Sequence, residues 1–344
     1  MLAWHAGGHA RSDAVRGARW DGAVIEARGL VKRYGKVTAV DDLSFDVPAG
    51  RVTGFLGPNG SGKSTTMRMI VGLDAPDAGW VTVGGRPYRS LPWPLHEVGA
   101  LLEAKAIHPG RSAANHLLAL AQTNGIARRR VDEVLELVGL QAVARRRAGT
   151  FSLGMGQRLG IAAALLGDPG VLLFDEPVNG LDPEGIRWVR TLLKRLAGEG
   201  RTVLVSSHLM SEMALTADHL VVIGRGRLVA QTSVDDFISR HAGRAVRVRS
   251  PRVGELARAL AARGVAVEPA GGGEVLVRGA DGAAVGELAA ELGIALHELS
   301  PATTSLEDAF MELTAASVDY HGEVAGQHGE VAGSHGAGGS GGRP

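Results

Sequence analysis

Two segments of the chain carry residues suited to phosphate chemistry. Residues 57–64 read Gly-Pro-Asn-Gly-Ser-Gly-Lys-Ser, and residues 171–176 read Val-Leu-Leu-Phe-Asp-Glu. Glycines let a loop curl so that its backbone N–H groups converge on phosphate oxygens, and a following helix offers its positive end. The second segment reads as a buried strand that ends in two carboxylates. Together they predict a site that binds and hydrolyses a nucleoside triphosphate.

The polar side chains of the loop each suit one part of that ligand. Lys63 can reach the β- and γ-phosphates, the Ser64 hydroxyl can bind Mg²⁺, and Thr65 can bond the α-phosphate. Residues 51–56 read as a short apolar strand and residues 63–71 as a helix, so the context favours a phosphate site over a simple glycine turn. The expected nucleotide-binding residues of the loop are Gly57, Pro58, Asn59, Gly60, Ser61, Gly62, Lys63, Ser64 and Thr65.

A third segment precedes the carboxylate strand and reads, over residues 151–160, Phe-Ser-Leu-Gly-Met-Gly-Gln-Arg-Leu-Gly. Together with the phosphate loop it resembles the signature motif of ABC-type ATPases, whose usual pattern is Leu-Ser-Gly-Gly-Gln. Ser152 and Gly154 keep the two positions that face the γ-phosphate in that family. The Ser-Leu-Gly-Met form is similar to ATP-binding subunits of bacterial exporters of the bacitracin-resistance and antibiotic-export type.

The resemblance implies roles for residues outside the loop. Tyr34 stands where the family places an aromatic ring that stacks on adenine. Asp175 would hold Mg²⁺ through its water shell, and Glu176 would act as general base toward the attacking water. His208, at the end of an apolar strand, would bond the γ-phosphate and orient that water. Glu176, His208 and Lys63 are therefore the expected catalytic residues.

Two further positions follow from the same resemblance. Asp182, within Gly-Leu-Asp-Pro at 180–183, corresponds to the family's D-loop and is also a suitable helix cap. Glu103 stands where most members have glutamine; a carboxylate binds Mg²⁺ or its water more strongly than an amide but adds negative charge beside the phosphates. We expect Ser64, Asp175 and Glu103 around the metal, and Glu103 to relay nucleotide state to a partner subunit.

Composition limits the class of protein. The chain has 344 residues, 45% of them hydrophobic, which is enough for a main domain and a smaller one. A net charge of +1 creates no field that attracts nucleic acid, so no nucleic-acid partner is expected. The absence of cysteine excludes disulfides and thiolate catalysis. No apolar stretch approaches the roughly 20 residues that span a bilayer, so any membrane role must be played through a partner.

The patterns of strands, helices and composition predict four parts. These are a disordered extension (1–22), an ABC ATPase domain (23–240), a small accessory domain (241–315) and a disordered Gly/His-rich tail (316–344).

The ATPase part should be α/β, a P-loop NTPase of ABC type with a mixed, mostly parallel sheet. Strands at 23–34, 42–47 and 79–83 are expected to supply its antiparallel edge, and residues from about 105 to 166 a helical subdomain. Arginine clusters at 128–130 and 145–147 are expected on solvated helix faces.

The accessory part has the element order strand, helix, strand, strand, helix, strand, expected at 245–249, 253–262, 265–268, 274–278, 284–292 and 294–299. That order indicates a small α+β ferredoxin-like module. A capped helix at 304–314 follows it, resembling the end of exporter-type ATPase subunits. The module shows no catalytic constellation, which favours regulation or docking.

For function, the resemblance implies the ATP-hydrolysing motor subunit of an export system, with ATP and Mg²⁺ as its ligands. Two copies would clamp two ATP molecules between the Lys63 loop of one and Ser152 and Gly154 of the other. A polytopic membrane permease would be the partner, which places the chain in the cytoplasm on the inner face of the cell membrane.

Other functions stay open at this point. Soluble ABC ATPases that act on ribosomes usually carry two ATPase domains, and those on DNA a long coiled coil, whereas this chain has one signature and no sustained heptads. An importer motor is nearer in class, but the signature variant, Glu103 and the C-terminal module favour export. A P-loop kinase or GTPase would leave residues 151–160 unexplained. The sequence does not identify the cargo, because in this architecture the translocation path belongs to the membrane subunit.

Overall fold

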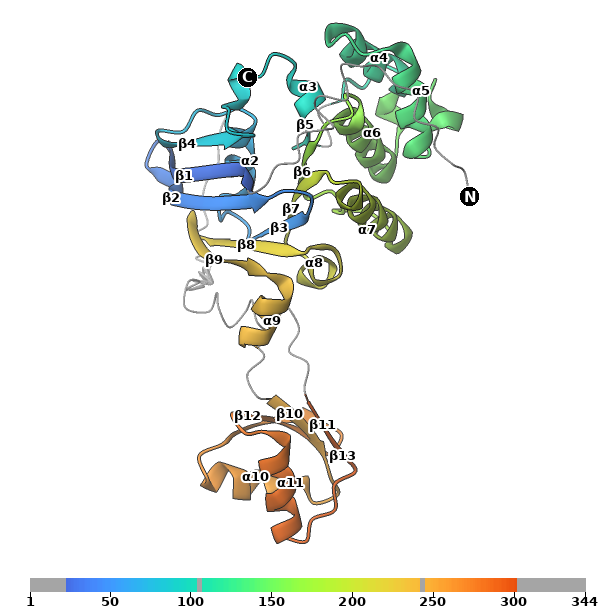
Figure 1. The fold of residues 1–344 in the computed structure, drawn as a ribbon. Coiled ribbons are helices and arrows are strands. Elements are labelled where there is room, and N and C mark those ends of the chain that lie inside the picture. Colours follow the sequence, from blue (N-terminus) through green and yellow to red (C-terminus); the bar gives the residue numbers. More distant parts are fainter. Residues whose placement is uncertain (1–22, 104–106, 242–244, 302–344) are drawn as a thin grey trace, which may run out of the picture.

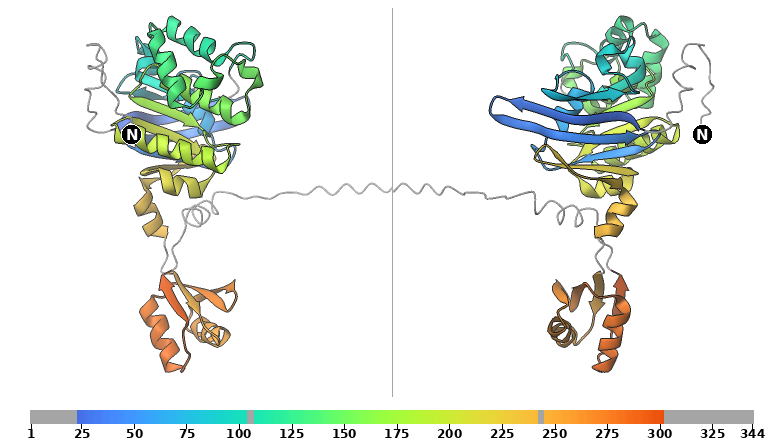
Figure 2. Two further views of the ribbon diagram at one scale, coloured as in Figure 1. Left: turned by 90° about the vertical axis from the view of Figure 1, so that its right-hand side faces the viewer. Right: turned by 60° about the vertical axis from the view of Figure 1, so that its left-hand side comes forward.

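The computed structural model describes residues 23–103, 107–241 and 245–301 (Figure 1). The two expected disordered ends, 1–22 and 316–344, and the expected helix at 304–314 lie outside the described residues. Described residues form two bodies in Figures 1 and 2: a large α/β body up to α9 and a small module that begins at β10.

A six-stranded sheet forms the centre of the large body, with the order β5-β6-β7-β3-β8-β9. The first five strands are parallel, and β9 pairs antiparallel at the edge. Strands β3 and β7 are buried at every position, which explains their apolar runs. The strands are β5 (Val98–Leu101), β6 (Val171–Asp175), β7 (Thr202–Ser207), β3 (Val52–Leu56), β8 (His219–Gly224) and β9 (Arg227–Ser233).

A second sheet has three antiparallel strands in the order β2-β1-β4. They are β1 (Ala23–Tyr34), β2 (Val37–Pro48) and β4 (Ala78–Val83). The three strands were expected at the edge of the parallel sheet, but they form a sheet of their own because β1 pairs with β2 on one side and β4 on the other. The antiparallel edge of the six-stranded sheet is β9 instead.

Helices cover the central sheet and form the helical subdomain. Around the sheet lie α2 (Lys63–Ile70), α3 (Pro94–Glu97), α7 (Pro183–Gly198), α8 (Met210–Thr216) and α9 (Val234–His241). The subdomain contains α4 (Ala113–Thr123), α5 (Arg128–Leu137) and α6 (Leu153–Leu165). Short 3-10 turns occur at Tyr88–Ser90, Gln141–Val143 and Ala148–Thr150.

Sequence accounts for where the subdomain helices start and pack. Ser112 caps α4 and Ser152 caps α6, each accepting a backbone N–H three residues on. One arginine departs from the expected solvated face: Arg130 donates to the carbonyls of Leu165 (3.0 Å) and Leu166 (3.3 Å), and its side chain is only 15% exposed. It binds carbonyls at the end of α6 that have no partner within the helix. The other members of both clusters are exposed as expected.

The small module has four antiparallel strands in the order β11-β12-β10-β13, the ferredoxin-like order predicted from its elements. Its elements are β10 (Ala245–Arg249), α10 (Val253–Ala262), β11 (Ala266–Gly271), β12 (Glu274–Arg278), α11 (Gly282–Glu291) and β13 (Glu298–Pro301). Its apolar core is separate from the two cores of the large body.

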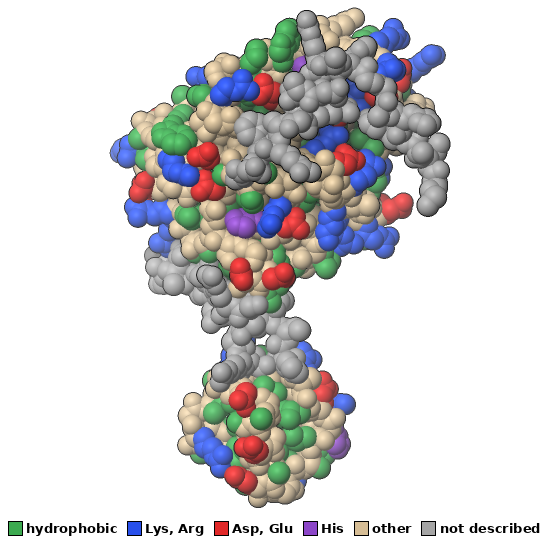
Figure 3. Space-filling model, viewed as in Figure 1, with side chains coloured by type: hydrophobic (Ala, Val, Ile, Leu, Met, Phe, Trp, Pro, Cys, Tyr) green, Lys and Arg blue, Asp and Glu red, His purple; other side chains and the backbone are tan. Residues whose placement is uncertain are grey.

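Charges of both signs are interspersed over the face shown in Figure 3. Within the described ranges, every helix is too short or too polar to cross a membrane.

Candidate nucleotide site

The site begins where three neighbouring strands end. Strands β6, β7 and β3 lie next to one another in the sheet, with Asp175 paired to Ser206 and Leu56 paired to Ser207. Because these strands are parallel, their carboxyl ends meet at one edge of the sheet (Figure 1). The phosphate loop after β3, the carboxylates after β6 and His208 after β7 are thereby brought together.

Glycines shape the phosphate loop by close approach. A Cβ on Gly57 would collide with the Ser61 hydroxyl and with the carbonyl of Ile223 in β8. Gly62 has φ +100°, and a Cβ there would lie 2.5 Å from the Ala39 carbonyl oxygen. Gly62 is also the N-cap of α2 and supplies no side-chain cap, which leaves the first N–H groups of this helix available to a ligand.

Lys63 is buried at the centre of this loop, with only 6% of its surface exposed. Its Nζ donates to the carbonyls of Gly57 (2.6 Å) and Pro58 (3.2 Å). Burial lowers the pKa of the Lys63 ammonium, and the negative charges of Glu176 and Asp175 offset part of that shift. The loop therefore contains a desolvated positive charge, which an anionic phosphate would stabilise.

Asp175 and Glu176 share one neighbour. The hydroxyl of Ser206, which is fully buried, donates a short hydrogen bond to Asp175 Oδ1 and accepts the backbone N–H of Glu176 at 2.9 Å. Glu176 has φ +49°, a left-handed conformation that non-glycine residues rarely adopt. Ser206 anchors this strained backbone through the Glu176 N–H.

His208 pairs with Glu176 across the ends of β7 and β6. Its Nδ1 lies 2.8 Å from Glu176 Oε2, with the two side chains 42% and 22% exposed. Gln157, one turn into α6, donates from Nε2 to the carbonyl of Glu176 at 3.4 Å. A carboxylate held next to an imidazole at a solvent-accessible edge can accept a proton from water and orient that water.

Tyr34 lies at the end of β1, close to the helix that follows the loop. Its hydroxyl donates to Asp74 Oδ2 at 2.9 Å, and the residue is 48% exposed. Burial, followed by the hydrogen bond to Asp74, raises the pKa of the Tyr34 hydroxyl, and a hydrogen bond with Thr65 offsets part of the shift. Through Asp74, which also binds Arg68, the Tyr34 hydroxyl is connected to α2, the helix that follows the phosphate loop.

Two further predicted residues, Ser152 and Asp182, cap helices. Ser152 is exposed and caps α6 through Met155 N–H (3.3 Å), and Asp182 caps α7 through Gly185 N–H (2.8 Å). Among described residues, no hydrogen bond or ion pair joins Ser152 or Gly154 to the phosphate loop. The structure brings together the loop, Asp175, Glu176, His208 and Tyr34; the signature segment touches this group through Gln157, whereas Ser152 and Gly154, within the described ranges, are not bonded to the loop.

The three predicted metal ligands do not form a closed cage. Ser64 and Glu103 are both exposed, and Asp175 is half-buried. No described group of three or more His, Asp or Glu is arranged to hold a cation. This donor set fits Mg²⁺, which keeps several waters and is usually bound through one or two protein oxygens and substrate phosphates.

A nucleoside triphosphate fits the residues present. The loop has a buried cation in Lys63, a glycine cradle that a Cβ would fill, and a buried Ser61 hydroxyl that has no partner in the described chain. Each of these features is satisfied by phosphate oxygens.

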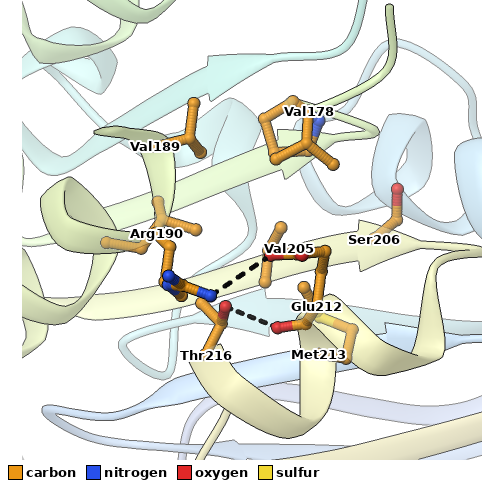
Figure 4. A pocket seen from close by; sticks show the side chains of 10 residues that line it. Val178, Val189, Arg190, Val205, Ser206, Glu212, Met213 and Thr216 are labelled. Carbon is orange, nitrogen blue, oxygen red and sulfur yellow. Dashed lines mark hydrogen bonds and ion pairs between the residues drawn. The ribbon is translucent and has the colours of Figure 1, made fainter. Parts of the chain in front are cut away.

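A small cavity lies behind this edge of the sheet, between β7, α7 and α8 (Figure 4). It measures about 10 Å³, room for one water at most. Arg190 and Glu212 line the cavity, and Arg190 Nη1 lies 3.6 Å from Glu212 Oε2. Thr216, also in the lining, donates to the Glu212 carbonyl at 2.6 Å. The remaining lining is mostly apolar and includes Val178, Val189, Val205 and Met213. This is a packing void rather than a substrate pocket.

Fold and site together define a P-loop nucleoside triphosphatase. A family model described as "ABC transporter" matches residues 40–179, and a model of a domain of unknown function matches residues 244–307. The chain is 43% identical over 216 residues to the uncharacterised ABC transporter ATP-binding protein YhcH of Bacillus subtilis, covering 62% of this chain and 71% of that protein. It is 41% identical over 221 residues to the bacitracin transport ATP-binding protein BcrA of Bacillus licheniformis, covering 63% and 72%.

A similar solved structure is described as "Dimeric Structure of MJ0796, a Bacterial ABC Transporter Cassette". It aligns with TM-score 0.57 and 25% identity, over 61% of this chain and 98% of that one. The chain belongs to the family of ABC transporter ATP-binding proteins. It binds ATP and is an ATPase, as the family assignment and the site both indicate.

Sequence reasoning missed two residues of the site, Ser206 and Gln157. Ser206 lies two residues before His208 in the same strand end, and its pairing with Asp175 becomes visible only once β6 and β7 are known to be parallel neighbours. Gln157 stands in the quoted signature segment, but its contact with the Glu176 carbonyl depends on how α6 packs. The position of Ser206 at the end of an apolar strand was the one signal available from sequence.

Proposed function

We propose that the chain is the motor subunit of an ABC-type export system and that it hydrolyses ATP in a head-to-tail dimer. The observation that carries the proposal is the arrangement of Lys63, Asp175 and the Glu176–His208 pair at the ends of three adjacent strands. The names of relatives support export of an antibiotic-like cargo, because one is a bacitracin transport protein.

Within one copy, the residues divide the chemistry as follows. Lys63 and the N–H groups that begin α2 bind and orient the β- and γ-phosphates, and Tyr34 stacks on the base. Ser64, and Asp175 through water, would hold Mg²⁺, which would supply positive charge beside the phosphates. Glu176 accepts the proton of the attacking water, and His208 holds the Glu176 carboxylate and reaches the γ-phosphate. No side chain forms a covalent bond to the nucleotide in these steps. The protein positions the reacting groups and stabilises charge.

The second copy would complete the site. Ser152 and Gly154 lie outside the group formed by the loop and the carboxylates, and Ser152 is exposed. In the proposed dimer they face the γ-phosphate bound by the partner copy, and Asp182 lies at the same interface. Closure then depends on the γ-phosphate, and hydrolysis permits reopening.

Glu103 follows β5, and we propose that it senses the metal and γ-phosphate and reports to the partner subunit. The side chain is exposed, which leaves it accessible to both. The proposal would be wrong if Glu103→Gln left both hydrolysis and transport unchanged.

We further propose that the ATPase part spans 23–240 and that residues 241–315 form an accessory part with a regulatory or docking role. Separate apolar cores support this division. The proposed location is the cytoplasmic face of the cell membrane, bound to a polytopic permease.

Co-purification tests the export proposal against a soluble role on ribosomes or DNA. Membranes from cells that express tagged Glu176→Gln are solubilised with Mg-ATP present, because loss of the base should keep the dimer closed. A stoichiometric polytopic membrane protein is the expected partner, and Lys63→Ala is the matched control that should lose nucleotide-dependent recovery. Recovery with ribosomal proteins or DNA alone would overturn export and leave the ATPase chemistry intact.

A further inference from the structure

A tyrosine clamp lies beside the phosphate loop; it consists of Tyr34, Asp74 and Arg68. Asp74 Oδ2 accepts the Tyr34 hydroxyl at 2.9 Å and Arg68 Nε at 2.8 Å, and Arg68 Nη2 lies 3.4 Å from Asp74 Oδ1. Arg68 belongs to the last turn of α2, the helix that begins at Lys63. The clamp therefore ties the tyrosine ring to the same helix whose start forms the phosphate site.

A fourth residue, Lys32, fixes which face of the ring a ligand can use. Lys32 Nζ lies 5.5 Å from the ring centroid and is itself held by the Ala75 carbonyl (2.7 Å) and Asp77 Oδ1 (3.3 Å). The ammonium occupies one face and leaves the other for a planar ligand. Since Tyr34 is 48% exposed, the ring is accessible while its hydroxyl is bound.

The protonation states of Asp74 and Tyr34 maintain the hydrogen bonds of the clamp. The Arg68 hydrogen bond, more than any other interaction, lowers the pKa of the Asp74 carboxyl, so that Asp74 stays an acceptor. Burial and the Asp74 hydrogen bond raise the pKa of Tyr34, so that its hydroxyl stays a donor. Donor and acceptor thus remain matched through the neutral range.

We propose that Asp74 and Arg68 are positioning residues for the nucleobase. They hold the Tyr34 ring at a fixed position relative to α2, so that the base and the phosphates bind to one rigid unit. The inference rests on Tyr34 as the base platform under Proposed function. A ring already held in its binding orientation loses less conformational freedom when the ligand arrives. The base-dependent part of nucleotide affinity should then depend on Asp74, whereas the phosphate-dependent part should not.

Calorimetric titration of the full chain with ADP and with inorganic pyrophosphate separates the two parts. Tyr34→Ala removes the platform and should weaken ADP binding about tenfold, the usual worth of base–aromatic stacking. Tyr34→Phe keeps the ring and removes the hydroxyl, and Asp74→Ala removes the acceptor; each should weaken ADP binding about threefold to fivefold. Pyrophosphate affinity should stay within about twofold of wild type in all three.

The matched control is Glu97→Gln, which breaks the Arg86–Glu97 ion pair (2.6 Å) elsewhere on the large body and should leave both affinities unchanged. If Tyr34→Ala weakens ADP binding but Tyr34→Phe and Asp74→Ala match wild type, the positioning role of Asp74 and Arg68 is refuted. Stacking of the base on Tyr34 is then still supported. An unchanged ADP affinity in Tyr34→Ala would refute the platform itself. Equal losses for ADP and pyrophosphate in Asp74→Ala would show a general effect on α2 and would also overturn the inference.

Discussion

At the residue scale, Ser206 joins the two carboxylates on which hydrolysis depends. Its hydroxyl donates to Asp175 and accepts the Glu176 N–H, all at a fully buried position. Ser206→Ala would remove one hydrogen bond from each partner, a loss of about 0.5–1.5 kcal/mol per bond. We expect kcat to fall about tenfold or more while ADP affinity stays near wild type, because the phosphate loop is untouched.

Steady-state phosphate release and ADP titration measure these two quantities. Ser206→Thr keeps the hydroxyl and is the conservative control, expected to recover much of the lost rate. Equal rates for Ser206→Ala and wild type would show that Glu176 keeps its orientation without this hydroxyl.

The buried charge of Lys63 gives nucleotide binding a pH dependence. Burial lowers the pKa of Lys63, so the free site loses its positive charge at a lower pH than an exposed lysine would. Bound phosphate favours the charged form. Pyrophosphate affinity should therefore be level below the lowered pKa and fall as pH rises through it.

Lys63→Arg is the control for this pH dependence, because a guanidinium stays charged; its pyrophosphate affinity, although weaker, should not fall on the alkaline side. Calorimetric titration from about pH 7 to pH 10 checks both profiles. A decline that starts only where an exposed lysine titrates would contradict the account.

At the element scale, the turn that starts α6 interlocks with the segment that precedes α7. Gly180 has φ +73°, and a Cβ there would collide with Leu153, while a Cβ on Gly154 would lie 3.2 Å from Leu181 Cδ2. Gly180→Ala therefore costs about 1–2 kcal/mol for the left-handed backbone and also displaces Leu153. We expect the variant to fold, with hydrolysis reduced because Ser152 and Gly154 shift with Leu153.

A double-mutant cycle isolates the collision from the backbone strain. Leu153→Ala combined with Gly180→Ala should recover part of the hydrolysis rate, because the small side chain makes room for the new methyl group. If the double variant is no faster than Gly180→Ala, strain in the backbone alone explains the loss.

The agreement between the elements predicted from sequence and those in the structure also differs from one element to the next. The carboxylate strand, β10, α10 and β12 were predicted to the residue, because each is a short periodic run bounded by turn residues. β13 begins at Glu298 rather than at Ile294, since Ile294 is buried without joining the sheet. Arg130 was misplaced on the solvent side, because its partners are carbonyls at the end of a helix distant in sequence. Local pattern determined the elements, whereas contacts between them came only from the structure.

At the scale of the whole molecule, the site in one copy consists of a loop, two carboxylates and a histidine, and Ser152 and Gly154 of the signature segment lie outside it. We propose that ATP joins these parts across two copies. A similar chain was solved as a dimer.

The most direct measurement is the mass of Glu176→Gln in solution by light scattering, with Mg-ATP and with Mg-ADP. Slow hydrolysis should preserve the γ-phosphate, so the account predicts a dimer with ATP and a monomer with ADP. Glu176→Gln combined with Gly154→Asp should stay monomeric with ATP, because a carboxylate would face the γ-phosphate. A mass that is independent of the nucleotide, or a dimer that survives this substitution, would contradict the claim.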